Sequence, residues 1–261
     1  MFNAYSLIVL FFLGLAGGSF ASVVIHRLHT KERGIFWGRS KCPKCQETLA
    51  ARDLIPLVSF VINQFKCRFC KERISWHYPI LELVMGIAFP LTAFLLMTTG
   101  TVDPTKVFWM LPFYLFVTFI FILLSFYDLY FQEVPDVIVL PAIVVSLLVA
   151  LVGNIHPNSN LIAGIALPLV FFGTLFVASR GQWLGGGDVR IGALMGVLLS
   201  WPQILVGLFL GYLLGAVYSL IGLATKKFQR KSHIPFAPFL FAGTYLTLFW
   251  GEKMIEWYLS F

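Results

Sequence analysis

Residues 107–128 read VFWMLPFYLFVTFIFILLSFYD and contain no charged side chain before the final residue, Asp128. A helix needs about 20 predominantly apolar residues to cross the hydrocarbon core of a bilayer. A strand of a membrane β-barrel would alternate apolar and polar residues over about ten positions, and this run does not alternate. The stretch therefore predicts a membrane-spanning helix with an acid at its end.

Seven further apolar runs extend this pattern along the chain. Apolar residues make up 59% of the 261 residues and charged residues 12%, against about 45–50% and about 25% in soluble domains. This composition excludes a disordered chain, a small disulfide-rich secreted fold and an ordinary soluble enzyme. We predict an all-α, polytopic membrane bundle of about eight transmembrane helices. The further runs lie near residues 4–25, 80–98, 137–152, 161–178, 189–201, 203–224 and 236–250.

The basic residues predict the orientation of the chain. With the N-terminus outside, only Lys106 and Lys253 of the 19 Lys and Arg residues lie toward the outer side. Cytoplasmic loops are enriched in Lys and Arg, so topology explains the net charge of +7 better than nucleic-acid binding does. No positive charge precedes the first run, which favours a retained helix over a cleaved signal peptide. The predicted cytoplasmic connections are residues 26–79, 128–136, 179–188 and 225–235.

All four cysteines lie in the predicted cytosolic loop, as Cys42-Pro-Lys-Cys45 and Cys67-Arg-Phe-Cys70. Two Cys-x2-Cys pairs at this spacing can supply four thiolates to one tetrahedral zinc ion. A site filled entirely by protein ligands is structural, and the loop, which has few apolar residues, would gain folding energy from the metal. The alternatives are two disulfides, which a reducing cytosol disfavours, or four free thiols. A basic nucleic-acid-binding ribbon is a lesser alternative.

Three of the 12 acids lie at predicted cytoplasmic helix ends. Asp128 ends one helix, Asp136 opens the next, and Asp188 follows the triplet Gly185-Gly186-Gly187. Two carboxyl groups held close together cannot both ionise. If Asp128 and Asp188 met, the ionised group would act as general base for a water molecule. The protonated one would polarise a scissile carbonyl and protonate the leaving amine.

Each acid also has a structural interpretation. Asp136 follows a proline and precedes an apolar run, which favours a capping or first-turn acid. Asp188 could be the N-cap of its helix, and Asp128 an interfacial loop acid. The run 189–201 corresponds to about 20 Å of helix, whereas the hydrocarbon core is about 30 Å thick. We therefore hypothesise that Asp188 lies in a protein-lined cavity within the membrane, where the glycines let backbone approach a substrate peptide.

Taken together, these features resemble the type IV prepilin leader peptidases, membrane aspartic peptidases of the GxGD type. The resemblance covers nearly the whole chain. It rests on Gly18-Ser19-Phe20, Val23 to Leu28, Ser40 to Cys45, Ile55-Pro56-Leu57, Cys67 to Cys70, Ile74-Ser75, Tyr78-Pro79, Glu82, Asp128 to Asp136, Gly185 to Arg190 and Ile234 to Phe239.

The resemblance implies that Asp128 and Asp188 are the catalytic pair. It implies cleavage of the basic leader of prepilins and pseudopilins, after a glycine, at the cytoplasmic face of the bacterial inner membrane. The glycine triplet is expected near the substrate. Glu133 and Glu82 are candidates to meet the basic leader, although Glu82 could equally pair with Arg or Lys in its own loop. The implied partners are these substrates and membrane lipid, with no nucleic acid.

Many members of this family also N-methylate the new terminal residue with S-adenosylmethionine, and the four-cysteine loop belongs to that larger form. This chain departs from the family in that loop and beside it. Phe65 stands at a glycine position that has been tied to methylation, and Leu54, Ser22 and His77 replace the usual Asn, Asn and Arg. Zinc is therefore the expected structural cofactor, and S-adenosylmethionine is expected only if the methyltransferase activity is retained.

Two functions of other classes stay open at this point. A proton-coupled transporter would place acids inside several spans and show internal repeats, and the sequence has neither. A zinc-ribbon membrane scaffold would leave Asp128 and Asp188 as helix caps without peptidase activity.

The expected segments are a first transmembrane helix over 1–25, a cytosolic four-cysteine loop domain over 26–79, and a transmembrane aspartic peptidase domain over 80–261.

Overall fold

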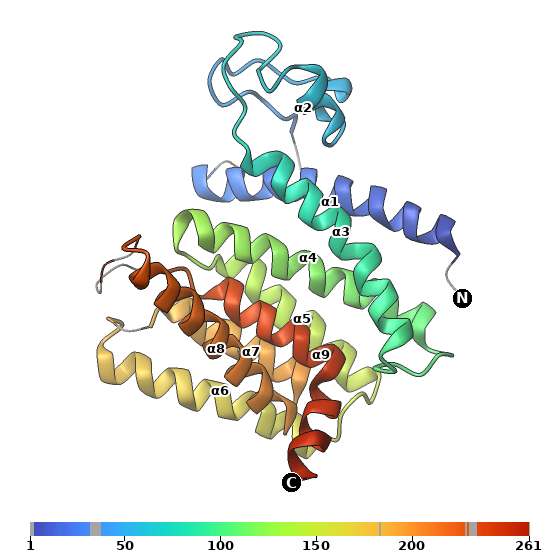
Figure 1. Ribbon diagram of the computed structural model, residues 1–261, viewed down its shortest axis with the longest axis vertical. Coiled ribbons are helices and arrows are strands. Elements are labelled where there is room, and N and C mark those ends of the chain that lie inside the picture. The colour runs from blue at the N-terminus through green and yellow to red at the C-terminus, as the bar shows by residue number, and fades with distance from the viewer. Residues whose placement is uncertain (1–2, 32–37, 183, 228, 230–233, 261) are drawn as a thin grey trace. The chain divides into compact units, whose positions relative to one another are not determined.

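The computed structural model describes residues 3–31, 38–182, 184–227, 229 and 234–260 and is built from helices (Figure 1). Over these residues the extended pairing amounts to two isolated bridges in the cysteine loop, so the all-α prediction is confirmed for the described part. Residues 32–37, 183, 228 and 230–233 of the predicted cytoplasmic loops lie outside it. The elements are α1 Ala4–Thr30, η1 Ala51–Leu54, α2 Val58–Ile62, α3 His77–Thr98, α4 Val107–Phe131, α5 Asp136–Val152, α6 Asn158–Ser179, α7 Gly186–Leu199, α8 Gln203–Ala224 and α9 Ala237–Leu259.

Each of the eight predicted runs falls on a helix, but the prediction of about eight transmembrane spans is not confirmed. Among the described residues, five helices are long and apolar enough to cross a membrane: α1, α3, α4, α6 and α8. The chain is therefore a multi-pass membrane protein by these criteria. Helices α5 and α7 have 17 and 14 residues, or about 26 and 21 Å of helix. Helix α9 carries Glu252, Lys253 and Glu256 in its second half.

The chain divides into two compact units. The first holds residues 1–98 and 105–123, and thus the cysteine loop with α1, α3 and most of α4. Helices α1 and α3 pack closely because Gly14 and Gly18 leave no side chain between the two backbones. A Cβ at Gly14 would collide with the carbonyl of Met85, and one at Gly18 with the backbone of Glu82. These contacts fix the first half of α3 against α1.

The second unit holds residues 99–104 and 124–261, and α7 lies at its centre. Helix α7 packs against α5, α6, α8 and α9 (Figure 1). Its residues Ile191, Met195 and Leu199 are fully buried. Helices α8 and α9 come close together where Gly211 faces Gly243, as small residues allow in membrane helix pairs. The packing of α7 against four helices positions the acid at its first turn.

Candidate active site

Asp128 lies in the last turn of α4 and is buried. Its Oδ2 accepts a hydrogen bond of 3.0 Å from the N–H of Ala237, the first residue of α9. The N–H groups of the first helical turn have no partner within their own helix, and the helix dipole favours a negative charge there. The start of α9 therefore provides a site for the Asp128 carboxylate. Asp128 is a helical residue, not the interfacial loop acid of the alternative interpretation.

Asp188 lies in the first turn of α7 and is half-buried. The N-cap of α7 is Gly185, so the interpretation of Asp188 as the N-cap is wrong. The Oδ2 of Asp188 accepts a hydrogen bond of 3.2 Å from the Gly185 N–H. This is the contact that a third-position acid makes with the residue that precedes a helix. The Gly185 N–H thus orients the Asp188 carboxyl group. The packing of α7 against its neighbouring helices fixes the position of Asp188 in the second unit.

The two predicted catalytic acids interact electrostatically. The charge of Asp128 acts on the carboxyl group of Asp188, although the residues belong to helices that are far apart in the chain. Each carboxyl group also accepts one backbone hydrogen bond, from Ala237 and from Gly185. The backbone donors hold both groups in defined orientations. Two close carboxyl groups repel each other when both are charged, so such a pair tends to share one proton.

The third acid, Asp136, has a different partner. It lies in the first turn of α5, as expected for a first-turn acid, after the N-cap Pro135. Its Oδ1 forms an ion pair with Nη1 of Arg190, two residues after Asp188 in α7. This ion pair joins the first turns of α5 and α7 and gives Asp136 a counter-ion of its own.

The glycine triplet serves two purposes. A Cβ at Gly187 would lie 2.7 Å from Cγ2 of Val134, so this glycine lets α7 pack against the connection between α4 and α5. A Cβ at Gly185 or Gly186 would meet no atom closer than 3.8 Å. The backbone at these two positions is therefore open to close approach, and the substrate role of the triplet stays a prediction.

The two predicted leader contacts occupy different environments. Glu133 is exposed in the connection between α4 and α5, a few residues after Asp128. Glu82 is buried in the first unit, and its Oε2 accepts a hydrogen bond of 2.8 Å from the Leu57 N–H. The carboxylate of Glu82 thus holds the cysteine loop against α3. This placement favours Glu133, rather than Glu82, for contact with a basic peptide.

Three participants in the site were missed by the sequence reasoning. The Ala237 N–H and the Arg190 side chain bind acids through tertiary contacts that leave no spacing pattern. Tyr212 of α8 is the third: the charge of Asp188 acts on it, and its ring centroid lies 5.0 Å from that of Phe236. The sequence does not distinguish it from Tyr218 and Ser219, which also carry hydroxyl groups in this largely apolar helix.

The four cysteines form a second cluster, in the first unit. The sulfur atoms of Cys42, Cys45, Cys67 and Cys70 all lie within 4.8 Å of one another, and none forms a disulfide. The Sγ atoms of Cys42 and Cys70 are 3.9 Å apart. Four sulfur ligands at about 2.3 Å from a tetrahedral zinc stand about 3.8 Å from one another. The cluster therefore fits a zinc ion.

Both Cys-x2-Cys segments adopt the same turn. In the first, the Cys42 N–H donates to the Glu47 carbonyl and the Gln46 N–H donates to the Cys42 carbonyl. The second repeats both hydrogen bonds 25 positions later, starting from Cys67 and Lys71. Gln46 and Lys71 both have a φ of 59°. Two matched turns that present four thiols to one point are the arrangement of a closed, structural metal site.

Apolar helices that carry two electrostatically interacting aspartates, one in the last turn of α4 and one in the first turn of α7, are the arrangement expected of a membrane aspartic peptidase. Two family sequence models match the chain: "Bacterial Peptidase A24 N-terminal domain" over residues 12–96 and "Type IV leader peptidase family" over residues 115–220. The first match contains the four cysteines, and the second contains Asp128 and Asp188. The chain belongs to the type IV leader peptidase family, and it is an enzyme of the prepilin peptidase class.

Curated relatives match over nearly their full length. A "Prepilin leader peptidase/N-methyltransferase" of Aeromonas salmonicida is 29% identical over 98% of this chain and 94% of the relative. Proteins of the same name from Bacillus subtilis and Pseudomonas aeruginosa are 28% and 26% identical, over 97% and 95% of this chain and 97% and 92% of the relatives. No solved structure matches the chain significantly.

Proposed function

We propose that this enzyme removes the leader peptide from prepilins and pseudopilins, with Asp128 and Asp188 as its catalytic pair. The observation that carries the proposal is the juxtaposition of these two acids, each oriented by a backbone N–H group. Asp136 is the natural comparison, because its charge is balanced by Arg190. We assign Asp136 a structural role.

The mechanism follows from the shared proton. The ionised carboxylate takes a proton from a water molecule held between the two acids, and the water oxygen attacks the scissile carbonyl carbon. The protonated carboxyl group donates a hydrogen bond to the carbonyl oxygen and later protonates the leaving amine. The open backbone at Gly185 and Gly186 lies next to Asp188. A substrate strand is expected to run along it.

The relatives' name supports prepilins as substrates. The positive-inside distribution supports an outer N-terminus and an active site at the cytoplasmic face of the bacterial inner membrane. Prepilin leaders are basic, so an acid near the catalytic pair would attract them. Exposed Glu133, five residues after Asp128, is our candidate for that contact. Lipid surrounds the apolar helices, and no feature of the site requires nucleic acid.

We further propose that the cysteine cluster holds one structural zinc ion through Cys42, Cys45, Cys67 and Cys70. When bound, zinc supplies a cross-link between the two turns, and four thiolates leave no open position for substrate. Binding energy of this kind is folding energy for a small loop with few apolar residues. The four sulfur atoms lie within 4.8 Å of one another, and this clustering supports the assignment.

A second activity, N-methylation of the new terminal residue with S-adenosylmethionine, is supported by the name of the relatives. Phe65, which departs from the glycine of the family, is accommodated in the loop. Its φ of 65° lies in the left-handed region that favours glycine. Its ring packs against Phe60 and Trp76, with centroids at 4.9 and 5.5 Å. The loop therefore holds a large aromatic ring at a position whose backbone conformation favours glycine.

The test uses membranes containing the full chain and a tagged prepilin. Cleavage after the glycine that precedes the pilin helix supports the peptidase, and mass spectrometry of the new N-terminus reads methylation in the same sample. A preparation that retains zinc but cleaves no prepilin or pseudopilin would favour the zinc-ribbon scaffold instead. A proton-coupled transporter predicts proton uptake into proteoliposomes, which the peptidase does not.

A further inference from the structure

Helix α2 of the cysteine loop has an exposed apolar face. Val58, Val61 and Ile62 are 48%, 63% and 73% exposed, and their spacing of three and four residues places them on one side of the helix. Phe60 projects from the other side and is buried. Ile55, just before the helix, is also exposed. Contiguous apolar surface of this kind marks protein–protein or membrane contacts, and we call these four exposed residues the α2 face.

A hydrogen bond connects the beginning of α2 to α3. Leu57, the N-cap residue of α2, donates its N–H to Oε2 of Glu82 at 2.8 Å. Glu82 lies in the second turn of α3, about 8 Å along the helix axis from its first residue, His77. The beginning of α2 is therefore held within one side-chain length of the second turn of α3.

An aromatic cluster provides a second connection between the two helices. The ring of Phe60 packs against those of Phe65 and Trp76, with centroids at 4.9 and 5.2 Å. Phe65 also stacks on Trp76, at 5.5 Å. Trp76 directly precedes α3 and is 62% exposed. Two independent contacts thus hold α2 beside the start of α3.

The length of α3 places its start at the membrane surface. Helix α3 is one of the helices long and apolar enough to cross a membrane, and its 22 residues span about 33 Å. The hydrocarbon core is about 30 Å thick, so nearly the whole helix is needed to cross it. Trp76 then lies at the interface, where tryptophan is enriched in membrane proteins. The α2 face is therefore held near the same surface.

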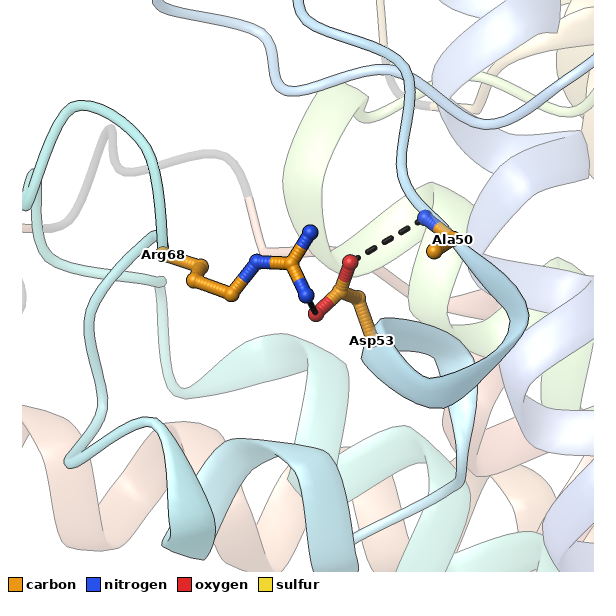
Figure 2. A network of polar contacts seen from close by, with 3 residues as sticks. All are labelled: Ala50, Asp53 and Arg68. Atoms are coloured by element: carbon orange, nitrogen blue, oxygen red, sulfur yellow. Dashed lines mark hydrogen bonds and ion pairs between the residues drawn. The ribbon is translucent and has the colours of Figure 1, made fainter.

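An ion pair connects α2 to the cysteine cluster. Asp53, in η1 just before α2, accepts a hydrogen bond of 3.1 Å from the Ala50 N–H through Oδ2. Its Oδ1 lies 3.6 Å from Nη1 of Arg68, which directly follows Cys67 (Figure 2). The segment that leads into α2 is thus joined to the second cysteine turn. A zinc ion in the cluster would therefore also stabilise the position of the α2 face.

The same loop carries an excess of positive charge. Residues 38–76 contain eight Lys and Arg residues and three Asp and Glu residues. A zinc ion with four thiolates would add two negative charges, and the loop would remain positive. The cytoplasmic leaflet carries anionic lipid, which attracts basic segments next to membrane spans. The basic residues exposed on the loop are Arg39, Lys41, Lys44, Arg52, Lys66, Lys71 and Arg73.

We propose that the cysteine loop docks on the membrane surface, with the α2 face inserted among anionic lipid headgroups. Lipid is the occupant that fits, because the contacts with α3 hold the face at the membrane and the charge around it is basic. The basic leader of a prepilin, or a second copy of this loop, would be repelled by the same charges. In the proposed orientation this surface is cytoplasmic, so docking would keep the loop beside the leaflet at which prepilins are cleaved.

Fluorescence quenching in lipid nanodiscs that hold the full zinc-loaded chain tests the proposal. A fluorescent noncanonical amino acid replaces either Ile62, in the α2 face, or Glu47, an exposed residue of the first cysteine turn. Phospholipid brominated in its acyl chains should quench the probe at Ile62 at least about threefold more strongly, because interfacial apolar side chains reach about 5–10 Å into the headgroup region. Acrylamide, which quenches from the water, should show the opposite order.

Two changes separate the apolar contribution from the charge. The double variant Val58→Ser with Val61→Ser should lower lipid quenching at Ile62 to about the level at Glu47 and retain zinc, because both valines are exposed. Thr48→Ser, in the first cysteine turn, is the control and should leave quenching unchanged. Exchange of phosphatidylglycerol for neutral phosphatidylcholine should weaken the quenching at Ile62. Unchanged quenching after this exchange would contradict the preference for anionic lipid.

The probe in the wild-type background keeps the test independent of how the serine variant folds. Equal lipid quenching at Ile62 and Glu47 would overturn the proposal. So would a probe at Ile62 that is protected from acrylamide but not quenched by lipid, since protein would then cover the α2 face. Failure of the chain to cleave prepilin would contradict the peptidase assignment and leave the docking surface standing.

Discussion

Asp136 and Arg190 form an ion pair that joins the first turn of α5 to the first turn of α7, two residues beyond Asp188. The pair distinguishes Asp136 from Asp128 and Asp188. Asp136 is matched by a cation, whereas Asp128 acts on Asp188 as a second negative charge. The same ion pair also makes Arg190 a positioning residue for the start of α7.

The first prediction concerns this ion pair. Its two side chains are 49% and 39% exposed, and ion pairs in contact with solvent contribute about 0–1 kcal/mol. Asp136→Asn is therefore expected to lower the rate of prepilin cleavage by less than about fivefold. Kinetics of Asp136→Asn, Arg190→Gln and the double variant provide the measurement. A loss from Asp136→Asn as large as that from Asp128→Asn would contradict the structural role.

The second prediction concerns the start of α7. Gly187→Ala would place a Cβ 2.7 Å from Cγ2 of Val134, and such overpacking typically costs about 1–3 kcal/mol. We expect lower thermal stability and slower prepilin cleavage. Gly186→Ala is the matched control, because its Cβ would meet only Phe176 at 3.9 Å. Val134→Ala should partly restore the activity of Gly187→Ala, and equal effects of the two glycine substitutions would argue against the packing.

The third prediction concerns metal content. Elemental analysis of the purified chain should find one zinc ion per chain, and Cys42→Ser or Cys67→Ser should lower that content sharply. Loss of the metal should also make residues 38–76 sensitive to protease, because the loop depends on the metal for folding energy. A zinc-free wild type whose cysteines are paired in disulfides by mass spectrometry would contradict the site.

The fourth prediction concerns the backbone at Phe65. A residue with a side chain in the left-handed region costs about 1–2 kcal/mol relative to glycine. Both Phe65→Ala and Phe65→Gly lose the ring contacts with Phe60 and Trp76, but only glycine relieves the backbone. We expect Phe65→Gly to be more stable than Phe65→Ala by about 1 kcal/mol in thermal unfolding of the full chain. Phe69, a half-exposed ring of the same loop outside the left-handed region, should show the opposite order.

The helices were predictable from sequence, and their ends less so. Uninterrupted apolar runs leave little alternative to helices in a bilayer, and each of the eight runs does form a helix. Helix α1 continues to Thr30, past the apolar run, because nothing in His26-Arg27-Leu28 breaks a helix. Helix α7 begins at Gly186, inside the glycine triplet, because the Asp188 carboxylate closes its first turn. The prediction of about eight spans is not confirmed, because hydrophobic runs reveal helices but not whether each reaches both faces.

The two sites differed in how much the sequence revealed. The cysteine cluster was predictable because thiol spacing within each turn is itself the signal. The meeting of Asp128 and Asp188 was predictable only as a consequence of topology, since helix ends on one side of a membrane can meet. The Ala237 N–H, Arg190 and the contacts between the cysteine loop and α3 depend on tertiary packing, so the sequence alone could not place them.

The central claim is that Asp128 and Asp188 together perform the cleavage, and the most direct measurement is cleavage of a tagged prepilin in membranes. We expect Asp128→Ala and Asp188→Ala each to abolish cleavage, with loss of about 10³-fold or more in rate, while both retain zinc and normal thermal stability. Asp136→Ala should retain cleavage. Full activity in Asp128→Ala or Asp188→Ala would contradict the account.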